Sequence, residues 1–315
     1  MTTAVAIALY NGEKFIEKQL DTIRLQTVKV DRVVLCDDGS SDNTFGLVED
    51  YISKFELGDS WKIYKNEKNL GYARNFYHAM ELCDCDLIYL CDQDDIWELE
   101  KLEKMNKIMV ENPNINLLSC KHGVIDAQDN EMNSVLERKC NDTEEIQLIS
   151  VDNIMHSYHW PGMGMCIRND FFKEILPIIQ DLKLAHDMVF ALISADRDSF
   201  FEYDYIGVHH RRHDNNAANE ESRISKLLNL KRKLRDVKVY NDLLSGVLSA
   251  GLPLSEFTQN KIKSKLDFSL LREESLKERS LLKMIKAYKG LNKDTFRIAT
   301  LLCDIWIICF GNCKN

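Results

Sequence analysis

The sequence predicts an α/β fold in which a mostly parallel sheet has helices on both faces, followed by a helical C-terminal region. Apolar runs alternate with amphipathic stretches from residue 5 to about residue 112, which is typical of parallel strands joined by helices. The composition changes near residue 219, after which Lys, Leu and Glu recur at helical spacing. We therefore expect a large α/β domain over residues 1–220 and a helical region over residues 221–315.

The expected elements follow one another along the chain. In the first part we expect strands and helices in alternation at Val5–Leu9, Glu13–Gln26, Arg32–Cys36, Thr44–Lys54, Trp61–Lys65, Tyr72–Leu82, Leu87–Cys91 and Glu98–Glu111. Next come a strand at Leu117–Val124, a polar insertion at Asp126–Glu145, a strand at Met163–Arg168, helices at Asp170–Gln180 and Asp187–Ala195, and a strand at Phe200–Val208. Two long helices, Ser225–Leu248 and Thr258–Lys289, are separated by the helix-breaking sequence Gly251-Leu252-Pro253.

Composition limits the class of protein. With 45% apolar and 29% charged residues the chain is typical of globular proteins. Its net charge of -9 argues against a nucleic-acid-binding protein, because duplex affinity comes largely from Lys and Arg. Ten cysteines without framework spacing, and a start without a basic leader, favour a reducing, cytoplasmic location.

The apolar C-terminal stretch Phe296–Phe310 includes Arg297 and Asp304 and is about fifteen residues long, whereas a membrane span needs roughly twenty. A packed helix is one interpretation. The other is peripheral contact with the inner face of the cell membrane, aided by the basic cluster at residues 226–235.

The first candidate site is Asp92-Gln93-Asp94-Asp95, directly after the strand Leu87–Cys91. Adjacent carboxylates repel one another when they are buried, so a cation or hydrogen-bond donors must compensate. Mg²⁺ or Mn²⁺ suits such a cluster, because these ions take one or two protein carboxylates and complete their shell with phosphate oxygens and water. A solvated acidic turn that caps the next helix is the alternative, and the residues alone leave both open.

Two other polar clusters follow predicted strands. Asp37-Asp38-Gly39-Ser40-Ser41-Asp42 can bind a base or ribose, or can simply form a strand-to-helix turn. His209-His210-Arg211-Arg212-His213 is followed by Asn215 and Asn216, and this concentration of cations suits a metal-bound diphosphate.

The order of these pieces resembles the family 2 glycosyltransferases, the inverting enzymes of the GT-A fold, from Val5 to about Ala217. The resemblance rests on Ala8-Leu9-Tyr10-Asn11-Gly12, the Asp37–Asp42 string, Asn69-Leu70-Gly71 with Asn75, Asp92-Gln93-Asp94-Asp95-Ile96-Trp97, His186-Asp187, and Arg211-Arg212-His213 with Asn215-Asn216. The acidic string and the later Arg-Arg-His are most similar to the bacterial rhamnosyltransferase-like enzymes of cell-surface polysaccharide synthesis.

The resemblance implies a role for each matching position. Asp187 is the expected catalytic base, although it is preceded by His186 where the family usually has an acidic residue. The expected metal site for Mn²⁺ or Mg²⁺ consists of Asp94, Asp92 and His213. The expected donor-binding residues are Leu9, Tyr10, Asn11, Asp37, Asp38, Asn69, Gly71, Asn75, Asp92, Gln93, Arg211 and Arg212. Of these, Asp38 is expected to hold the base.

The acceptor is expected to meet Trp160, Gly162 and His186, because an aromatic ring suits the apolar face of a sugar; a core Trp at a turn is the alternative. The implied activity is transfer of a sugar, such as rhamnose, from a dTDP- or UDP-sugar to a glycan or lipid-linked acceptor. A non-catalytic binding protein of the same fold and a sugar nucleotidyltransferase are the alternatives. The oligomeric state is left open, with a homo-oligomer among the options.

Overall fold

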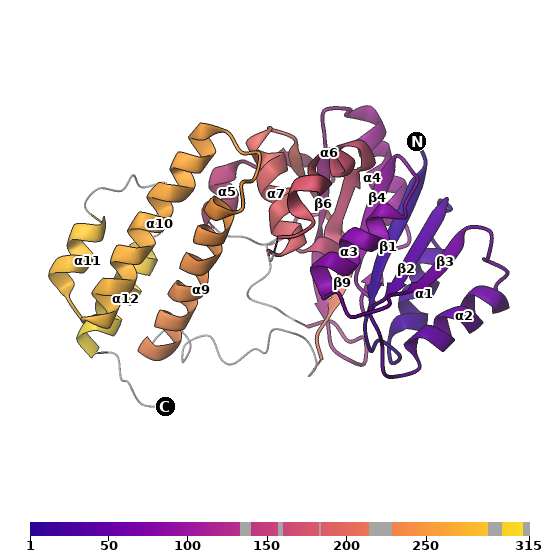
Figure 1. The fold of residues 1–315 in the computed structure, drawn as a ribbon, viewed down its shortest axis with the longest axis horizontal. Helices are drawn as coiled ribbons and strands as arrows, with labels where there is room; N and C mark the ends of the chain where they lie inside the picture. The colour runs from indigo at the N-terminus through magenta and orange to yellow at the C-terminus, as the bar shows by residue number, and fades with distance from the viewer. Residues whose placement is uncertain (133–139, 157–159, 183, 214–228, 289–297, 311–315) are drawn as a thin grey trace. The chain divides into compact units, whose positions relative to one another are not determined.

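The computed structural model describes residues 1–132, 140–156, 160–182, 184–213, 229–288 and 298–310 (Figure 1). The chain divides into two compact units. The first is built from Met1–Ser150 and His159–Asp214, and the second from Val151–Tyr158 and Asn215–Asn315. The domain boundary expected near residue 220 lies outside the described residues, as do Asn215 and Asn216 of the last motif.

A single sheet forms the centre of the first unit, with strand order β3-β2-β1-β4-β8-β6-β9-β5 and β7 paired to β9. Its strands are β1 (Thr3–Leu9), β2 (Arg32–Asp37), β3 (Trp61–Lys65), β4 (Leu87–Cys91), β5 (Ile96–Trp97), β6 (Leu117–Ile125), β7 (Ile146–Leu148), β8 (Met165–Arg168) and β9 (Phe200–Arg211). The strands β1 to β4 are parallel, and β6 and β9 run in the same direction because β8 is antiparallel to both β4 and β6. This confirms the predicted mostly parallel sheet.

Helices cover both faces of this sheet (Figure 1). They are α1 (Ile16–Arg24), α2 (Thr44–Lys54), α3 (Tyr72–Glu81), α4 (Lys101–Glu111), α6 (Asn169–Ile179) and α7 (His186–Asp196). On one face, α1, α2 and α4 pack on alternate strand residues such as Val5, Ile7 and Leu9. Elsewhere in the same unit α3, α6 and α7 are joined by the aromatic contacts of Tyr77, Phe172 and Phe190.

Several elements differ from the predicted ones. The strand β9 continues to Arg211, so the first residues of the His-Arg cluster belong to the strand. The short strands β5 and β7 were not predicted, because two or three residues give no periodic signal. A 3₁₀ turn, η1 (Gly162–Gly164), precedes β8.

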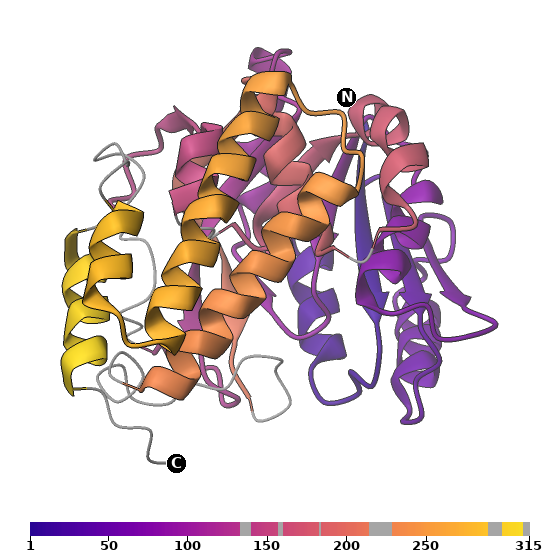
Figure 2. The same ribbon diagram turned by 60° about the vertical axis from the view of Figure 1, so that its left-hand side comes forward.

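The second unit is helical, with α5 (Val151–His156), α9 (Leu230–Ser249), α10 (Glu256–Lys277), α11 (Leu281–Tyr288) and α12 (Ile298–Phe310). Figure 2 shows α9 and α10 side by side. Asn229 and Ser255 cap these two helices through their side-chain oxygens. Asp304 of α12 is fully buried and binds the Arg272 guanidinium through two hydrogen bonds. Among the described residues, no helix has both the length and the apolar character needed to cross a membrane.

Candidate active site

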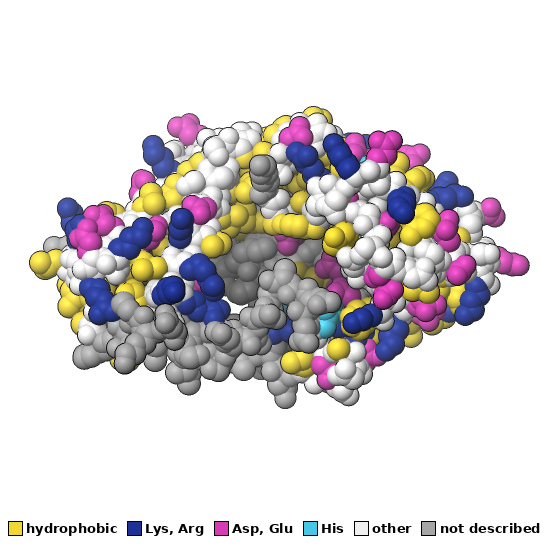
Figure 3. Space-filling view, turned by 60° about the horizontal axis from the view of Figure 1, so that its bottom comes forward, with side chains coloured by type: hydrophobic (Ala, Val, Ile, Leu, Met, Phe, Trp, Pro, Cys, Tyr) yellow, Lys and Arg dark blue, Asp and Glu magenta, His cyan; other side chains and the backbone are white. Residues whose placement is uncertain are grey.

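The predicted site residues gather where the parallel strands end. Tyr10 follows β1, Asp37 ends β2, Asp92 follows β4 and Arg211 ends β9. Because parallel strands place their carboxyl ends at one edge, these positions share an edge of the sheet, where α/β proteins bind ligands. Figure 3 views this side and shows acidic side chains gathered beside a histidine.

The acidic cluster lies between β4 and β5. Asp95 is fully buried, and its Oδ1 accepts hydrogen bonds from the Arg211 backbone N–H at 3.0 Å and from His210 Nδ1 at 3.1 Å. Asp94 Oδ2 lies 2.9 Å from His213 Nε2. The structure therefore brings Asp94 and His213 into contact, and their expected binding of a shared metal ion stays a prediction.

Burial and mutual repulsion raise the pKa values of two carboxylates in this cluster. Burial raises the pKa of Asp92 well above its usual value, and the charges of Asp95 and Asp94 raise it further. Burial likewise raises the pKa of Asp94, followed by the charge of Asp95. Asp95 Oδ2 is buried without a hydrogen-bond partner among the described residues. These features fit a cation, which would stabilise the ionised carboxylates.

The kinds of metal site differ in the number of ligands that the protein supplies. Within the described residues, no group of three or more His, Cys, Asp or Glu side chains surrounds a common point. Structural zinc sites have such closed shells, whereas Mg²⁺ and Mn²⁺ accept one or two carboxylates and obtain other ligands from phosphate and water. Binding of a divalent ion by Asp92 and Asp94 stays a prediction.

Gln93 fastens the loop after β1 to the acidic cluster. Its side-chain amide accepts a hydrogen bond from the Tyr10 backbone N–H and donates one to the Tyr10 carbonyl, both at 2.9 Å. A Cβ at Gly12 would lie 2.4 Å from Gln93 Oε1, so these two hydrogen bonds between Gln93 and Tyr10 need glycine at position 12. Asn11 adopts φ 51° and its Oδ1 accepts the Ser41 N–H at 2.8 Å. Tyr10 remains 52% exposed.

Asp38 supports the loop that precedes α3. Its carboxylate accepts hydrogen bonds from Asn66 Nδ2 and from the backbone N–H groups of Leu70 and Gly71 at 2.7–2.8 Å. Asn69 Nδ2 donates to the Asp38 carbonyl at 2.9 Å, and Gly71 adopts φ 81°. Asp38 thus fixes the conformation of this loop through hydrogen bonds, and its contact with a base stays a prediction.

Four of the predicted donor-binding residues besides Asp38 are buried and bind other parts of the protein through their side chains, so their contact with the donor stays a prediction. Leu9 belongs to the apolar core, and Asp37 caps its own turn by accepting the Ser40 N–H at 3.1 Å. Asn75 donates to the Cys36 carbonyl at 2.8 Å. Fully buried Arg211 donates its Nε to the Asp94 carbonyl at 2.7 Å. Strand ends supply backbone partners that compete for such side chains.

Two further predicted site residues, Arg212 and Trp160, contact other parts of the protein. The half-buried Arg212 donates its backbone N–H to Ile125 at 2.8 Å. Trp160 is only 1% exposed; its Nε1 donates to Glu202 at 2.6 Å and its ring lies edge-on to Phe200. Trp160 therefore packs in the core, as in the alternative interpretation of the sequence, and its contact with an acceptor stays a prediction.

The start of α7 presents the candidate base. Asp187 is half-buried, and its Oδ1 accepts its neighbour's N–H, that of Met188, at 2.7 Å. Its charge contributes to the raised pKa of Asp92 and, after burial, to that of Tyr72. The Asp187 carboxylate is therefore one of the charges that act on the acidic cluster.

His186 is enclosed by aromatic rings. Its ring centroid lies 4.5 Å from that of Phe76 and 6.0 Å from that of Tyr72. Neither ring nitrogen has a hydrogen-bond partner among the described residues, and burial lowers the pKa of the imidazole. A Cβ at Gly162 would lie 2.8 Å from His186 Nε2, so these two predicted acceptor residues do adjoin each other.

Sequence reasoning missed two residues at this edge. Asn66 connects Asp38 with Asn75 through its side-chain amide, and no motif marked it. Tyr72 is 63% exposed beside His186. Its position directly after the Asn69-Leu70-Gly71 motif is the signal that could have identified it.

Comparison with known proteins identifies the family. The model of glycosyl transferase family 2 matches residues 4–166, more than half of the chain. The dTDP-rhamnosyl transferase RfbG of Shigella flexneri is 33% identical over 110 residues, which are 34% of this chain and 37% of RfbG. The glucosyltransferase WfgD of Escherichia coli, named for a UDP-Glc donor and a GlcNAc-diphosphoundecaprenol acceptor, is 31% identical over 39% of this chain and 46% of WfgD. The chain thus matches less than half the length of these relatives.

Solved structures of similar fold extend further along the chain. Staphylococcus aureus TarS 1–349 in complex with UDP has a TM-score of 0.59 at 18% identity, covering 91% of this chain and 75% of TarS. The mannosyltransferase PcManGT of Pyrobaculum calidifontis, in complex with GDP-Man and Mn²⁺, has a TM-score of 0.55 at 14% identity, covering 98% of this chain and 87% of PcManGT. The layered, mostly parallel sheet is the GT-A fold. With its acidic edge and the family match over residues 4–166, this chain belongs to glycosyl transferase family 2.

Proposed function

We propose that this protein transfers a sugar from a nucleoside-diphosphate donor to a glycan or lipid-linked acceptor in cell-surface polysaccharide synthesis, with inversion at the anomeric carbon. The observation that carries the proposal is the acidic cluster at the carboxyl edge of the sheet, where Asp94 contacts His213 and the buried Asp95 Oδ2 has no hydrogen-bond partner among the described residues. The half-buried Asp187 at the start of α7 is the candidate base. The acidic cluster suits a metal-bound diphosphate, and Asp187 suits the role of general base.

The residues divide the reaction between them. Asp94, Asp92 and His213 would hold Mn²⁺ or Mg²⁺, and His213 also contacts the Asp94 carboxylate. A divalent ion there supplies positive charge to the departing diphosphate. Asp187 accepts the proton of the acceptor hydroxyl as its oxygen forms the new bond to the anomeric carbon and the bond to the phosphate oxygen breaks. A single displacement with no covalent intermediate inverts the configuration.

The donor is proposed to be a dTDP- or UDP-sugar, with rhamnose as one candidate. Two similarities support this choice: RfbG is named as a dTDP-rhamnosyl transferase, and TarS was solved with UDP. The name of WfgD supports a lipid-linked acceptor. We accordingly place the protein in the cytoplasm, at the inner face of the membrane, where such acceptors are extended.

A donor-hydrolysis screen tests the proposal. The protein is incubated with dTDP-rhamnose, UDP-glucose and other sugar nucleotides in Mn²⁺, Mg²⁺ or EDTA, and release of nucleoside diphosphate is measured. Asp94→Asn should abolish metal-dependent release. The control variant Glu174→Asn should not, because Glu174 lies on α6, outside the acidic cluster, and forms an ion pair with Arg197. Nucleotide binding by the wild type without turnover of any donor would favour the non-catalytic alternative.

A further inference from the structure

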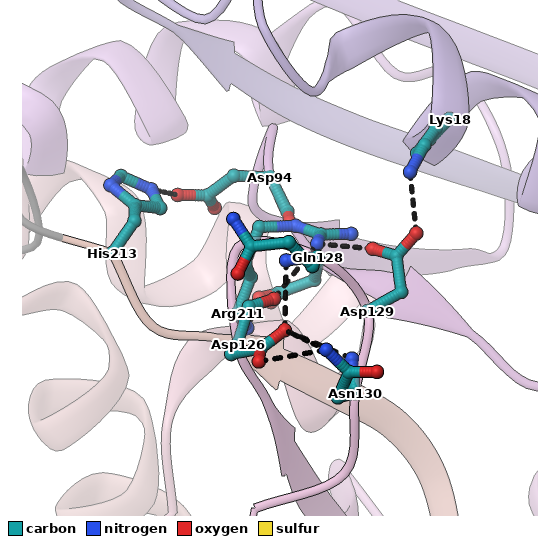
Figure 4. A network of polar contacts seen from close by, with 9 residues as sticks. Lys18, Asp94, Asp126, Gln128, Asp129, Asn130, Arg211 and His213 are labelled. Carbon is teal, nitrogen blue, oxygen red and sulfur yellow. Dashed lines mark hydrogen bonds and ion pairs between the residues drawn. The ribbon is translucent and has the colours of Figure 1, made fainter.

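Arg211 connects three parts of the acidic edge from a fully buried position (Figure 4). Its backbone N–H donates to Asp95 Oδ1 at 3.0 Å, and its Nε donates to the Asp94 carbonyl at 2.7 Å. Its Nη1 donates to the Asp126 carbonyl at 3.1 Å and forms an ion pair with Asp129. A single side chain thus binds the loop of Asp94 and Asp95 to the loop after β6.

The loop after β6 is built to present Asp129. Asp126 Oδ1 accepts the backbone N–H groups of Gln128 and Asn130 at 2.8 and 2.9 Å, and Asp129 adopts φ 70°. The Asp129 carboxylate then lies between the Arg211 guanidinium and the Lys18 ammonium of α1, with which it also forms an ion pair (Figure 4).

The start of α1 completes the arrangement. The Arg211 guanidinium lies 4.8 Å from the centroid of the Phe15 ring, and the His213 ring stacks on Phe15 at 4.9 Å and 27°. His213 in turn contacts the Asp94 carboxylate. Asp94 is therefore held at its carbonyl by Arg211 and at its carboxylate by His213, and both supports pack on Phe15.

We propose that Asp129 is a positioning residue for metal binding: by pairing with buried Arg211, and being held by Lys18, it fixes the loop that presents the Asp94 carboxylate. The inference rests on the proposed function, because it needs Asp94 to bind the ion. Its physical basis is that a buried guanidinium is stable only when it is paired. Without Asp129, Arg211 must seek other partners or water and would release the Asp94 carbonyl.

Asp129→Asn tests the proposal, because it keeps the size of the side chain and removes only its charge. The probe is Mn²⁺ in the presence of UDP, and binding is followed by the electron paramagnetic resonance signal of free Mn²⁺. Residues that orient metal ligands typically contribute about 10–100-fold to metal affinity, so we expect about tenfold weaker Mn²⁺ binding. The KM for Mn²⁺ should rise similarly, while kcat at saturating Mn²⁺ changes by less than about threefold, because the chemistry itself is unaltered.

Two further variants make the result decisive. Lys18→Met removes the more exposed partner, whose side chain is 57% exposed, and should weaken Mn²⁺ binding in the same direction by about two- to threefold, the scale of an exposed ion pair. Glu174→Gln is the control: it breaks the carboxylate–guanidinium pair between Glu174 on α6 and Arg197, and it should leave Mn²⁺ affinity unchanged. Unchanged affinity in both Asp129→Asn and Lys18→Met would overturn the positioning role. A wild-type protein that binds no Mn²⁺ would instead overturn the metal assignment on which it rests.

Discussion

Gly12→Ala should destabilise the acidic edge through Gln93. The new Cβ would lie 2.4 Å from Gln93 Oε1 and 2.6 Å from its Cδ, so the side chain must leave its position. That movement breaks both hydrogen bonds between Gln93 and Tyr10. At about 0.5–1.5 kcal/mol each, the loss is about 1–3 kcal/mol. Because Gly12 has no positive φ, alanine there returns about 0.4–1 kcal/mol by restricting the unfolded chain.

A double-mutant cycle measured by urea unfolding checks this reasoning. Gln93→Ala should lower the free energy of unfolding by about 1–3 kcal/mol, because it removes the two hydrogen bonds. Gly12→Ala removes the same two bonds but should cost about 0.4–1 kcal/mol less, because of its effect on the unfolded chain. The double variant should be no less stable than Gln93→Ala alone, because the methyl group then occupies vacated space. Additive losses from Gly12→Ala and Gln93→Ala would refute both the steric clash between the new methyl group and Gln93 and the contribution of the Gln93–Tyr10 hydrogen bonds.

Three further outcomes follow from other contacts. Tyr72→Ala should reduce transfer to an acceptor while donor hydrolysis is retained, since the exposed ring lies beside His186; an equal loss of both rates would argue against an acceptor contact. Asp304→Ala should lower the free energy of unfolding by about 3–5 kcal/mol, because it leaves the buried Arg272 charge unpaired; a loss below about 1 kcal/mol in denaturant titration would contradict this. Hydrogen bonding to Lys121 lowers the pKa of Asp204, so its stabilisation is present above an unfolded pKa of about 3.9 and is lost as the pH falls below that value. The stability difference between wild type and Asp204→Asn should therefore shrink between about pH 5 and pH 2, and a constant difference would exclude the ion pair as its source.

The sequence predicted the location of the site better than the orientation of its side chains. Acidic residues directly after β2 and β4 indicated the carboxyl edge, because strand direction follows from the alternation of strands and helices. The pairing of Asp94 with His213 joins positions 119 residues apart, and only the resemblance to a family placed them together. Periodicity alone carries no information about contacts at that separation.

The burial of several predicted site residues has a common physical origin. A polar residue at a strand end can face a ligand, or it can satisfy the unpaired backbone groups of neighbouring loops. Asn75 and Arg211 do the latter, through the carbonyls of Cys36 and Asp94. The same residue types occur in ligand-binding positions, so the sequence alone does not distinguish the two arrangements. Asp129 was missed for the related reason that its expected segment was treated as a polar insertion, whereas its role depends on Arg211 at the end of a distant strand.

The chemical roles of Asp187 and the acidic cluster can be separated by one measurement. Wild type and Asp187→Asn are compared with a donor identified in the screen, in Mn²⁺, by following donor affinity, the rate of transfer and the anomeric configuration of the product by nuclear magnetic resonance. The account predicts that the wild type gives an inverted product and that Asp187→Asn keeps its donor affinity but loses at least about a hundredfold in rate, the scale of a general base. A retained anomeric configuration, or an Asp187→Asn variant as fast as the wild type, would contradict it.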